Sequence, residues 1–377
     1  YLGGTSVVGM VFKINLDGTG FTNLHSFTPL STVYPLYTNY DGGYPLGALT
    51  LSGQTLYGTT SRGGALGNGC VFAVNTDGTG FTNLHSFADR EGRNPQAELV
   101  LSGSTLYGTT YEGGSSGSGT VFKLETNGGG FSVVHSFTAI PRYPAAPTNE
   151  DGANPASGLI ISGNTLFGTT CSGGKGYGSV FAVNTDGTGF TNLHWFSATC
   201  TECQTNSGGA YPQGRLTLVG NTLYGTTPGS ENFGPGTIFA VRTDGTGFTT
   251  LHKFSNGAPG PLNLVINDDG LYPRGGLLLS DYTLYGTTGQ GGSMGYGTVF
   301  SLSLLPQLTI TTSGAQVVLT WPTNLVGFAA EFTLQSSTNF VFPGAWTPVS
   351  PKPVVINGLN TVTELISDGP KFYRLSQ

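Results

Sequence analysis

One repeated block of five residues constrains this chain more than any other feature of its 377 residues. The block is Leu-Tyr-Gly-Thr-Thr, and its copies are Leu56–Thr60, Leu106–Thr110, Leu166–Thr170 (with Phe167 in place of tyrosine), Leu223–Thr227 and Leu284–Thr288. Self-similarity at a period of about 50–60 residues is typical of solenoids and propellers, because each unit buries its apolar face only against its neighbours. The chain is therefore expected to be a series of like units.

Each repeat contains four short extended runs. A Leu-x-Leu run precedes the block, as at Leu49–Leu51, and the block itself is the second run. A Gly-rich loop then leads to a Val-Phe run. After an Asp-Gly turn comes a run of the type Phe-Thr-Asn-Leu-His-Ser-Phe, which we call the histidine run. Such runs, separated by Gly and Asn turns, predict antiparallel strands. Four of them per repeat are the signature of a propeller blade.

The number of copies predicts a closed ring. Three of the runs occur five times, whereas six Val-Phe runs begin at Val11, Val71, Val121, Val180, Ile238 and Val299. We therefore expect an all-β fold in which residues 1–303 form a five-bladed β-propeller, and the two ends of this region share one blade, which removes a free edge. The surplus Val-Phe run, near Val11 or Val299, is expected to pair with a second copy of the chain by strand addition and so form a homo-oligomer.

The repeat stops at Pro306, and residues 306–377 have a different pattern. Their seven strand-like runs are Leu308–Thr312, Gln316–Trp321, Phe328–Gln335, Ala345–Val349, Pro353–Ile356, Thr361–Ile366 and Phe372–Leu375. This density of short strands predicts a small β-sandwich of the immunoglobulin or fibronectin type. Trp321 and Tyr373 lie where such a fold has its core tryptophan and its late tyrosine. We expect this module to be a spacer or docking domain.

The repeat motifs occur together and in a fixed order over about residues 3–303. Leu-Tyr-Gly-Thr-Thr, the loop Gly-Gly-x-x-Gly-x-Gly and Val-Phe, in this order, resemble the GloVer tandem-repeat family. A Gly-Gly pair after a strand is also similar to the kelch blade. The resemblance implies a secreted or surface-anchored bacterial protein of propeller type, without an assigned activity.

The composition excludes several classes of protein. Only 9% of residues are charged, the net charge is −6, and the 14 lysines and arginines form no basic run. Binding to nucleic acid or to anionic membranes is therefore not expected. No apolar stretch approaches 18 residues, so membrane insertion is not expected either. Because Tyr1 is not an initiator methionine, we expect a mature, exported chain.

The four cysteines favour a disulfide in an exported protein. Cys200 and Cys203 form a Cys-x-x-Cys pair, but Gln204 stands where haem attachment requires histidine. Cys70 and Cys171 are far apart and unpaired, which argues against a four-cysteine zinc site. A bridge from Cys171 to Cys200 or Cys203 and a Cys200–Cys203 bond both stay open.

Five histidines and several Asp-Gly turns invite a metal interpretation, which their spacing disfavours. One histidine per blade leaves the imidazoles too far apart to share a metal ion. We instead expect half-buried packing histidines, each with one hydrogen bond, and alternation places His25 on the same side as Phe21 and Phe27. The Thr-Asp-Gly-Thr-Gly segments, as at Asp77, lack calcium-loop spacing and predict hairpin turns. No metal and no cofactor are therefore expected.

Departures from the shared pattern mark the candidate site. The residue before the Leu-x-Leu run is small in three copies, whereas Glu98 and Arg215 break this pattern with opposite charges. Near the ring axis they are expected to pair or to face a ligand at the channel mouth. The connections from each histidine run to the next Leu-x-Leu run, which we call the variable connections, differ in length and sequence, as binding loops on repeat scaffolds do. Their candidate ligand-binding residues are Asp41, Tyr44, Glu91, Asp151, Tyr211, Asp269 and Tyr272. Acidic groups beside tyrosines suit contacts to carbohydrate or cations, and they equally suit plain turns.

Together these features favour a non-enzymatic extracellular or cell-surface protein with a structural, adhesive or self-assembling role. An extracellular glycan or a cell-surface protein is the expected partner. A lectin-like carbohydrate-binding protein is the first alternative. A glycan-cleaving enzyme is the second, although its channel would need two or three carboxylates, and Glu98 is the one that the pattern reveals.

Overall fold

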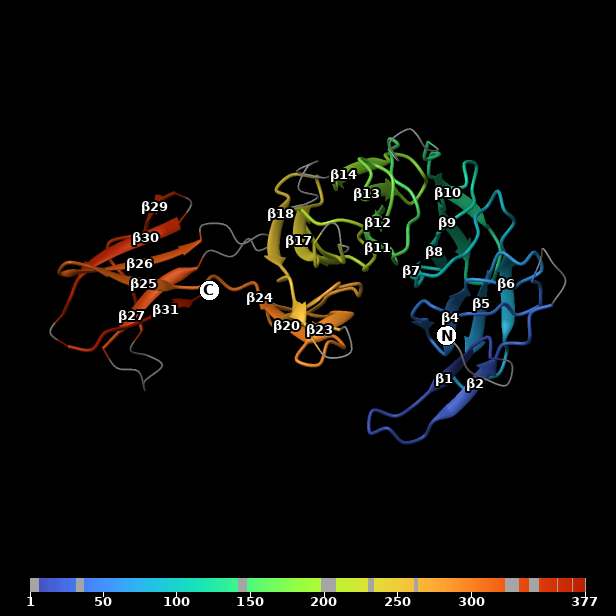
Figure 1. Ribbon diagram of the computed structural model, residues 1–377, viewed down its shortest axis with the longest axis horizontal. Helices are drawn as coiled ribbons and strands as arrows, with labels where there is room; N and C mark the ends of the chain where they lie inside the picture. The colour runs from blue at the N-terminus through green and yellow to red at the C-terminus, as the bar shows by residue number, and fades with distance from the viewer. Residues whose placement is uncertain are drawn as a thin grey trace. The chain divides into compact units, whose positions relative to one another are not determined.

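The structure is a computed structural model that describes residues 7–31, 37–141, 148–197, 208–229, 234–260, 264–322, 332–338, 346–357, 359–367 and 369–376 (Figure 1). Strands are the only regular elements in these residues, which confirms the all-β class for them. Accordingly, none of these ranges contains a helix long and apolar enough to cross a membrane.

The chain divides into two compact units. The first, which we call the repeat body, comprises Tyr1–Leu218, Leu223–Leu278 and Gly286–Phe300. The second, which we call the C-terminal body, comprises Ser301–Gln377 and the two short segments Val219–Thr222 and Leu279–Tyr285.

Four complete sheets follow one another along the repeat body, and each contains the four predicted runs in sequence order. The first is β3 (Thr50–Ser52), β4 (Thr55–Thr60), β5 (Cys70–Asn75) and β6 (Thr82–Ser86); the second is β7 (Val100–Ser102), β8 (Thr105–Thr110), β9 (Thr120–Glu125) and β10 (Ser132–Ser136); the third is β11 (Ile160–Ser162), β12 (Thr165–Thr170), β13 (Ser179–Asn184) and β14 (Thr191–Trp195); the fourth is β15 (Thr217–Val219), β16 (Thr222–Thr227), β17 (Thr237–Arg242) and β18 (Thr249–Lys253). Short β-rich runs with glycine turns between them account for this antiparallel pattern.

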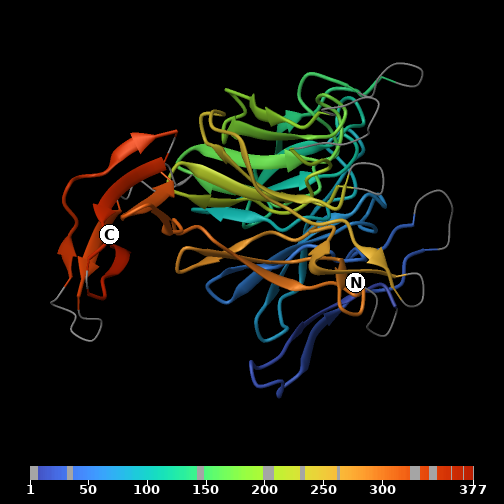
Figure 2. The ribbon, with the colours of Figure 1, turned by 60° about the vertical axis from the view of Figure 1, so that its left-hand side comes forward.

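In the described residues, the strands near the two ends of the repeat region belong to separate sheets. β1 (Met10–Lys13) pairs with β2 (Thr22–Ser26) in a sheet of two strands, while β21 (Leu278–Ser280), β22 (Thr283–Thr287) and β24 (Val299–Ser303) form a separate sheet. β1 and β24 are both Val-Phe runs, so both would take the same place in one sheet, and each has its own partner instead. In Figure 2 the dark blue β1–β2 hairpin projects from the sheets that follow it. The described residues therefore form four complete sheets flanked by two incomplete ones, and the closure of the ring by the chain ends stays a prediction.

Consecutive sheets pack through two different faces. We call the face that carries the phenylalanine of the Val-Phe run the front face, and the opposite face the back face. The back face of β3–β6, with Val71 and Phe87, packs on the front face of β7–β10, with Leu106 and Phe122, and all four side chains are fully buried. The same back-to-front contact recurs from β1–β2 through the fourth sheet. Burying apolar area on both faces of each inner sheet is the main source of stability in such an array.

The histidine run begins with a phenylalanine, such as Phe21, which was predicted to point to the same side as the histidine, and this prediction is wrong. His85 stacks on Phe131 of the following sheet, whereas Phe81 stacks on His25 of the preceding one. A β-bulge between Val71 and Phe72 shifts the register against the histidine run. The extra residue reverses the alternation, so the phenylalanine and the histidine point to opposite faces.

A further small sheet joins the last variable connection of the repeat body to the Gly-rich loop that follows the next Leu-Tyr-Gly-Thr-Thr block. It consists of β19 (Ala258–Pro259), β20 (Val265–Leu271) and β23 (Gln290–Gly292). β20 carries Asp269, one of the candidate site residues.

The described residues of the C-terminal body form two antiparallel sheets that share one core. One sheet has the order β25 (Thr309–Ser313), β26 (Gln316–Pro322), β30 (Leu359–Leu365) and β29 (Val354–Ile356); the other has the order β28 (Thr347–Pro348), β27 (Thr333–Ser337) and β31 (Phe372–Ser376). Trp321, Leu334 and Val362 are buried between them, with Tyr373 packed alongside. The Tyr373 hydroxyl donates to Glu364 Oε2 at 2.5 Å. Each of the seven predicted runs overlaps one of these strands.

Candidate functional site

The acidic residues of the variable connections bind the histidines of the preceding strands. The Nε2–carboxylate distances are 3.0 Å for His25–Asp41, 3.1 Å for His85–Glu91, 2.9 Å for His135–Asp151 and 3.2 Å for His252–Asp269. We call each such carboxylate with its histidine a loop clamp. The expectation of a packing histidine with one hydrogen bond is thus confirmed for these four residues.

The clamp carboxylates also hold the start of the connection. Asp41 is 3% exposed; its Oδ2 accepts the Thr28 amide at 2.9 Å and its Oδ1 accepts the Thr28 hydroxyl. Asp151 accepts the same two groups from Thr138. Burial alone would raise the pKa of Asp151, but the hydrogen bonds from His135 and Thr138 outweigh it and hold that pKa below its usual value. Asp151 is therefore an ionised acceptor, and both of its carboxylate oxygens accept hydrogen bonds from donors of the chain itself.

Three of the clamp histidines also contribute to packing between sheets. His25 stacks on Phe81 of the next sheet, with ring centroids 3.7 Å apart, and meets its own neighbour Phe27 edge-on at 4.9 Å. His85 and His135 repeat both contacts. One imidazole thus joins a strand, the next sheet and a variable connection.

His194, in β14 of the third complete sheet, has no carboxylate partner among the residues that the structure describes. Gly208 occupies the position of Asp41, since its carbonyl accepts a hydrogen bond from the strand residue Thr237 as the Asp269 carbonyl does from Thr298. His194 still stacks on Phe248, at 3.4 Å. Burial, together with the positive charge of Lys175, lowers the pKa of His194 to about 4. This sheet is a natural comparison for the effect of the clamp acid.

We predict that Gly208→Asp raises the pKa of His194 back towards its ordinary value, because a carboxylate then stabilises the imidazolium. In the wild-type chain the unfolded state binds more protons than the folded state between the ordinary value of 6.5 and about 4, so His194 lowers stability as the pH falls through this window. The aspartate variant is expected to lose that dependence. NMR titration of the imidazole and unfolding at several pH values measure both effects. Gly208→Asn is the neutral control, and an unchanged His194 pKa in Gly208→Asp would contradict the assignment.

The candidate tyrosines share one backbone conformation. Tyr44, Tyr211 and Tyr272 have φ angles of 57°, 60° and 57°, and each precedes a proline. Asn94 and Asn154 take the same position in the other copies, at 59° and 56°. A positive φ is unusual for a bulky residue and marks a constrained turn. The backbone amide at this position donates to the Gly-rich loop of the preceding repeat, as Asn94 does to Asn68 at 2.9 Å. This geometry supports the turn interpretation, while ligand binding by the tyrosine rings stays a prediction.

Glu98 and Arg215 lie together. Arg215 Nε donates to Glu98 Oε1 at 2.8 Å, which confirms the expected pairing. They come from the second and fourth complete sheets, and Gly158 of the third sheet lies beside them: a Cβ there would stand 2.5 Å from Glu98 Cγ. The starts of three Leu-x-Leu runs therefore converge, and a small residue between the two charged ones permits the ion pair.

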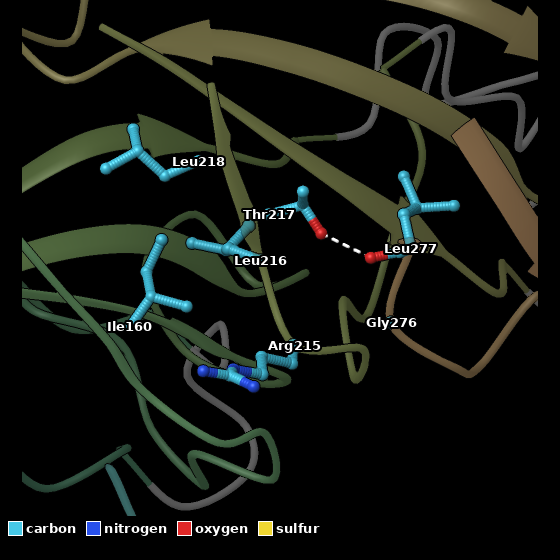
Figure 3. Close-up of a pocket in the computed structure, with 7 residues that line it drawn as sticks. All are labelled: Ile160, Arg215, Leu216, Thr217, Leu218, Gly276 and Leu277. Atoms are coloured by element: carbon cyan, nitrogen blue, oxygen red, sulfur yellow. Dashed lines mark hydrogen bonds between the residues drawn. The ribbon is translucent and has the colours of Figure 1, made fainter. Parts of the chain in front are cut away.

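A cavity of about 260 Å³ adjoins this pair (Figure 3). Its lining consists of Ile160, Arg215, Leu216, Thr217, Leu218, Gly276 and Leu277. The Thr217 hydroxyl donates to the Leu277 carbonyl along one wall. An aliphatic wall with one guanidinium at its edge suits a small ligand with an apolar part and an acceptor group. The sequence analysis found Arg215 through its departure from the repeat, but the aliphatic lining residues follow the repeat and carry no such signal.

A comparison with models of protein families supports the repeat that was identified in the sequence. Residues 1–149 match the model of the Gloeobacter/Verrucomicrobia repeat family. The resemblance drawn from the motifs is thereby confirmed. No curated protein matches the chain. Among solved structures, a nidogen/laminin complex is 14% identical, with 65% of this chain and 72% of that chain covered and a TM-score of 0.41. TolB from Acinetobacter baumannii is 12% identical, with 83% and 56% covered and a TM-score of 0.39. Likenesses this weak carry no functional argument.

The Asp-Gly segments form turns between strands, as predicted, and each of these turns is an Asx turn. Asp77 Oδ1 accepts both the amide and the hydroxyl of Thr79, at 2.9 and 2.7 Å, and Asp17, Asp186 and Asp244 do the same in their copies. These bonds lower the pKa of each exposed carboxyl. Within the described ranges, no three histidine, cysteine, aspartate or glutamate side chains gather at a spacing that suits a metal ion.

The cysteines of these repeats that the structure describes are free thiols. Cys70 and Cys171 are both buried, and burial raises the pKa of the Cys70 thiol to about 12. Cys171 Sγ donates to the Asn154 carbonyl at 3.1 Å, so the expected bridge from Cys171 is not formed. Cys200 and Cys203 lie outside the described residues, and a bond between them stays a prediction.

Proposed function

We propose that this chain is a non-enzymatic extracellular or cell-surface protein whose propeller-type repeat sheets serve a structural, adhesive or self-assembling role. The observation that carries the proposal is that the acidic side chains of the candidate site bind other side chains of the same chain. In the loop clamps, a histidine binds each of the carboxylates of Asp41, Glu91, Asp151 and Asp269. Arg215 binds the carboxylate of Glu98. A hydrolase of glycans needs two carboxylates free to face a substrate, one as an acid and one as a base or nucleophile.

The C-terminal body supports the same role. Its described strands form one antiparallel sheet of four strands and one of three. Two sheets of this size around one core are compatible with an immunoglobulin-like sandwich. We propose that it is a docking or spacer module of that type. The five-bladed ring stays a prediction, since it requires the two incomplete sheets to meet.

Two measurements test the proposal. Purified protein is incubated with a panel of bacterial and plant polysaccharides, and released reducing sugar is assayed; no release is expected, and any turnover that is lost in Glu98→Gln would overturn the non-enzymatic role. Protease treatment of intact producing cells, followed by immunoblotting, tests the location. Digestion of the protein outside the cell is expected, and protection equal to that of a cytoplasmic marker would contradict it.

Carbohydrate binding is the second candidate, favoured by the cavity beside the Glu98–Arg215 pair. This pair offers charged donor and acceptor groups at the edge of an aliphatic pocket. A glycan array tests it with Arg215→Ala, since a site in the cavity loses binding on this change. The pair is partly exposed, so the variant is expected to lose less than about 1 kcal/mol of stability. Lys175→Ala, which alters an exposed cation outside the cavity lining, is the control.

A further inference from the structure

The two incomplete sheets leave uncovered the faces that inner sheets bury. On β1–β2 the front face carries Phe12, which is 49% exposed, whereas its equivalents Phe72 and Phe122 are fully buried. Ile14 and Phe21 on the same hairpin are 50% and 56% exposed. Phe12 and Phe21 stack on each other with ring centroids 5.3 Å apart. We call these three residues the first-sheet face.

In the last sheet of the repeats, formed by β21, β22 and β24, the back face is the one that is uncovered. Val299, at the start of β24, is 80% exposed, whereas its equivalents Val71 and Val121 are fully buried. Leu278 is 67% exposed, against 8% for Ile160 at the same position of the third sheet. Both residues belong to the back face, and the front face of the same sheet is covered, since Phe300 meets Phe254 edge-on. We call Leu278 and Val299 the last-sheet face.

The two faces are a complementary pair. Every inner interface joins a back face, with a valine from the Val-Phe run, to a front face, with the phenylalanine of that run. Among the described residues, no sheet follows the last-sheet face, which is a back face, and no sheet precedes the first-sheet face, which is a front face. One chain therefore presents both halves of the contact that it makes several times internally.

We propose that copies of this chain associate end to end, with the last-sheet face of one copy packed on the first-sheet face of the next. The occupant of each face is a second copy of the chain. The last sheet of that copy offers the back face that fits the first-sheet face, and its first sheet offers the front face that fits the last-sheet face. Such a contact is heterologous, so it generates closed rings or open filaments rather than an isologous dimer. It differs from the strand addition expected from the sequence, because the uncovered groups are side chains of a sheet face. The inference rests on the self-assembling form of the proposed function and names its interface.

The test uses two variants that each block one face. Phe12→Asp and Val299→Asp are both expected to be monomers of 39.0 kDa in analytical ultracentrifugation, whereas the wild-type mass rises with concentration. Mixing the two variants is the decisive step. The intact last-sheet face of Phe12→Asp then binds the intact first-sheet face of Val299→Asp, and a species of twice the monomer mass is expected.

Several outcomes would overturn the proposal. A wild-type monomer at all concentrations indicates that the chain closes on itself or leaves the faces bare, and a monomeric mixture contradicts the pairing of the two faces. Dimers of a single variant would indicate an isologous contact. Leu66→Asp, which changes an exposed leucine in a Gly-rich loop, is the control and is expected to assemble as the wild type does. Circular dichroism confirms the fold of each variant. Failure of assembly leaves the non-enzymatic role intact, since the polysaccharide assay is read independently of mass.

Discussion

Replacing Phe122 by alanine is expected to lower the free energy of unfolding by about 3–5 kcal/mol, because the change removes a fully buried ring and leaves a cavity between two sheets. Phe122 meets Phe87 of the preceding sheet edge-on, with centroids 4.9 Å apart, and stacks at 6.0 Å on Phe131 of its own sheet. Such aromatic pairs add to the simple burial of apolar area. Urea unfolding followed by circular dichroism measures the loss.

Phe12→Ala is the matched control, because Phe12 has the same place in the repeat. Its ring is half exposed and packs chiefly on Phe21 of the same hairpin. Surface substitutions usually change stability by about 0.5 kcal/mol or less, and we expect a loss below about 1 kcal/mol here. Measurement below the concentration at which copies associate keeps the two effects apart. Equal losses in the two variants would contradict the assignment of Phe12 to an uncovered face.

The strand content of this fold is readable from the sequence because the repeat supplies the same evidence several times. The runs around Leu106–Thr110 and Val121 became the central strands β8 and β9, as predicted. The polar positions of the turns, such as Asp77, also behave as their local chemistry requires. These features depend on contacts within a few residues, which a sequence pattern records directly.

A sequence pattern does not show which distant segments pair with each other. The surplus Val-Phe run was counted correctly, but counting does not say whether β1 joins the last sheet or pairs with β2 alone. The bulge opposite Val71 adds one residue without altering the motif, so alternation gave the wrong side for Phe21. In both cases the outcome depends on backbone hydrogen bonds across a sheet rather than on residue type.

The loop clamps show the same limit at the candidate site. The acid follows its histidine by 16 residues in Asp41 and Asp151 but by 6 in Glu91, so no fixed spacing links them. The signal that was available is the recurring acid-Gly pair three residues before a tyrosine or asparagine followed by proline. Sequence reasoning identified these acids as turn or ligand residues, and it did not find that each one binds the histidine of its own repeat.

Removing a clamp acid is the second change expected to have a large effect. Asp151→Ala leaves the Thr138 amide, the Thr138 hydroxyl and His135 Nε2 without their acceptor in a site where Asp151 is only 5% exposed. A buried donor left unpaired costs about 1–3 kcal/mol, so we expect a total loss of about 2–4 kcal/mol. Asp151→Asn keeps one amide oxygen as an acceptor and is expected to lose less. Chemical unfolding of the three proteins measures the series.

The pH dependence separates a charged clamp from a merely space-filling residue. Because hydrogen bonds hold the pKa of Asp151 below its ordinary value of 3.8, its stabilising contribution is present above that pH and is lost as the pH falls towards the lower pKa of the folded chain. The difference in stability between the wild type and Asp151→Ala should therefore shrink below pH 3.8. Asp186→Ala, which removes an exposed Asx-turn acid, is the control and is expected to have a much smaller effect at neutral pH. A difference between the wild type and Asp151→Ala that stays constant into acid would mean that the carboxylate acts through its volume rather than through its charge.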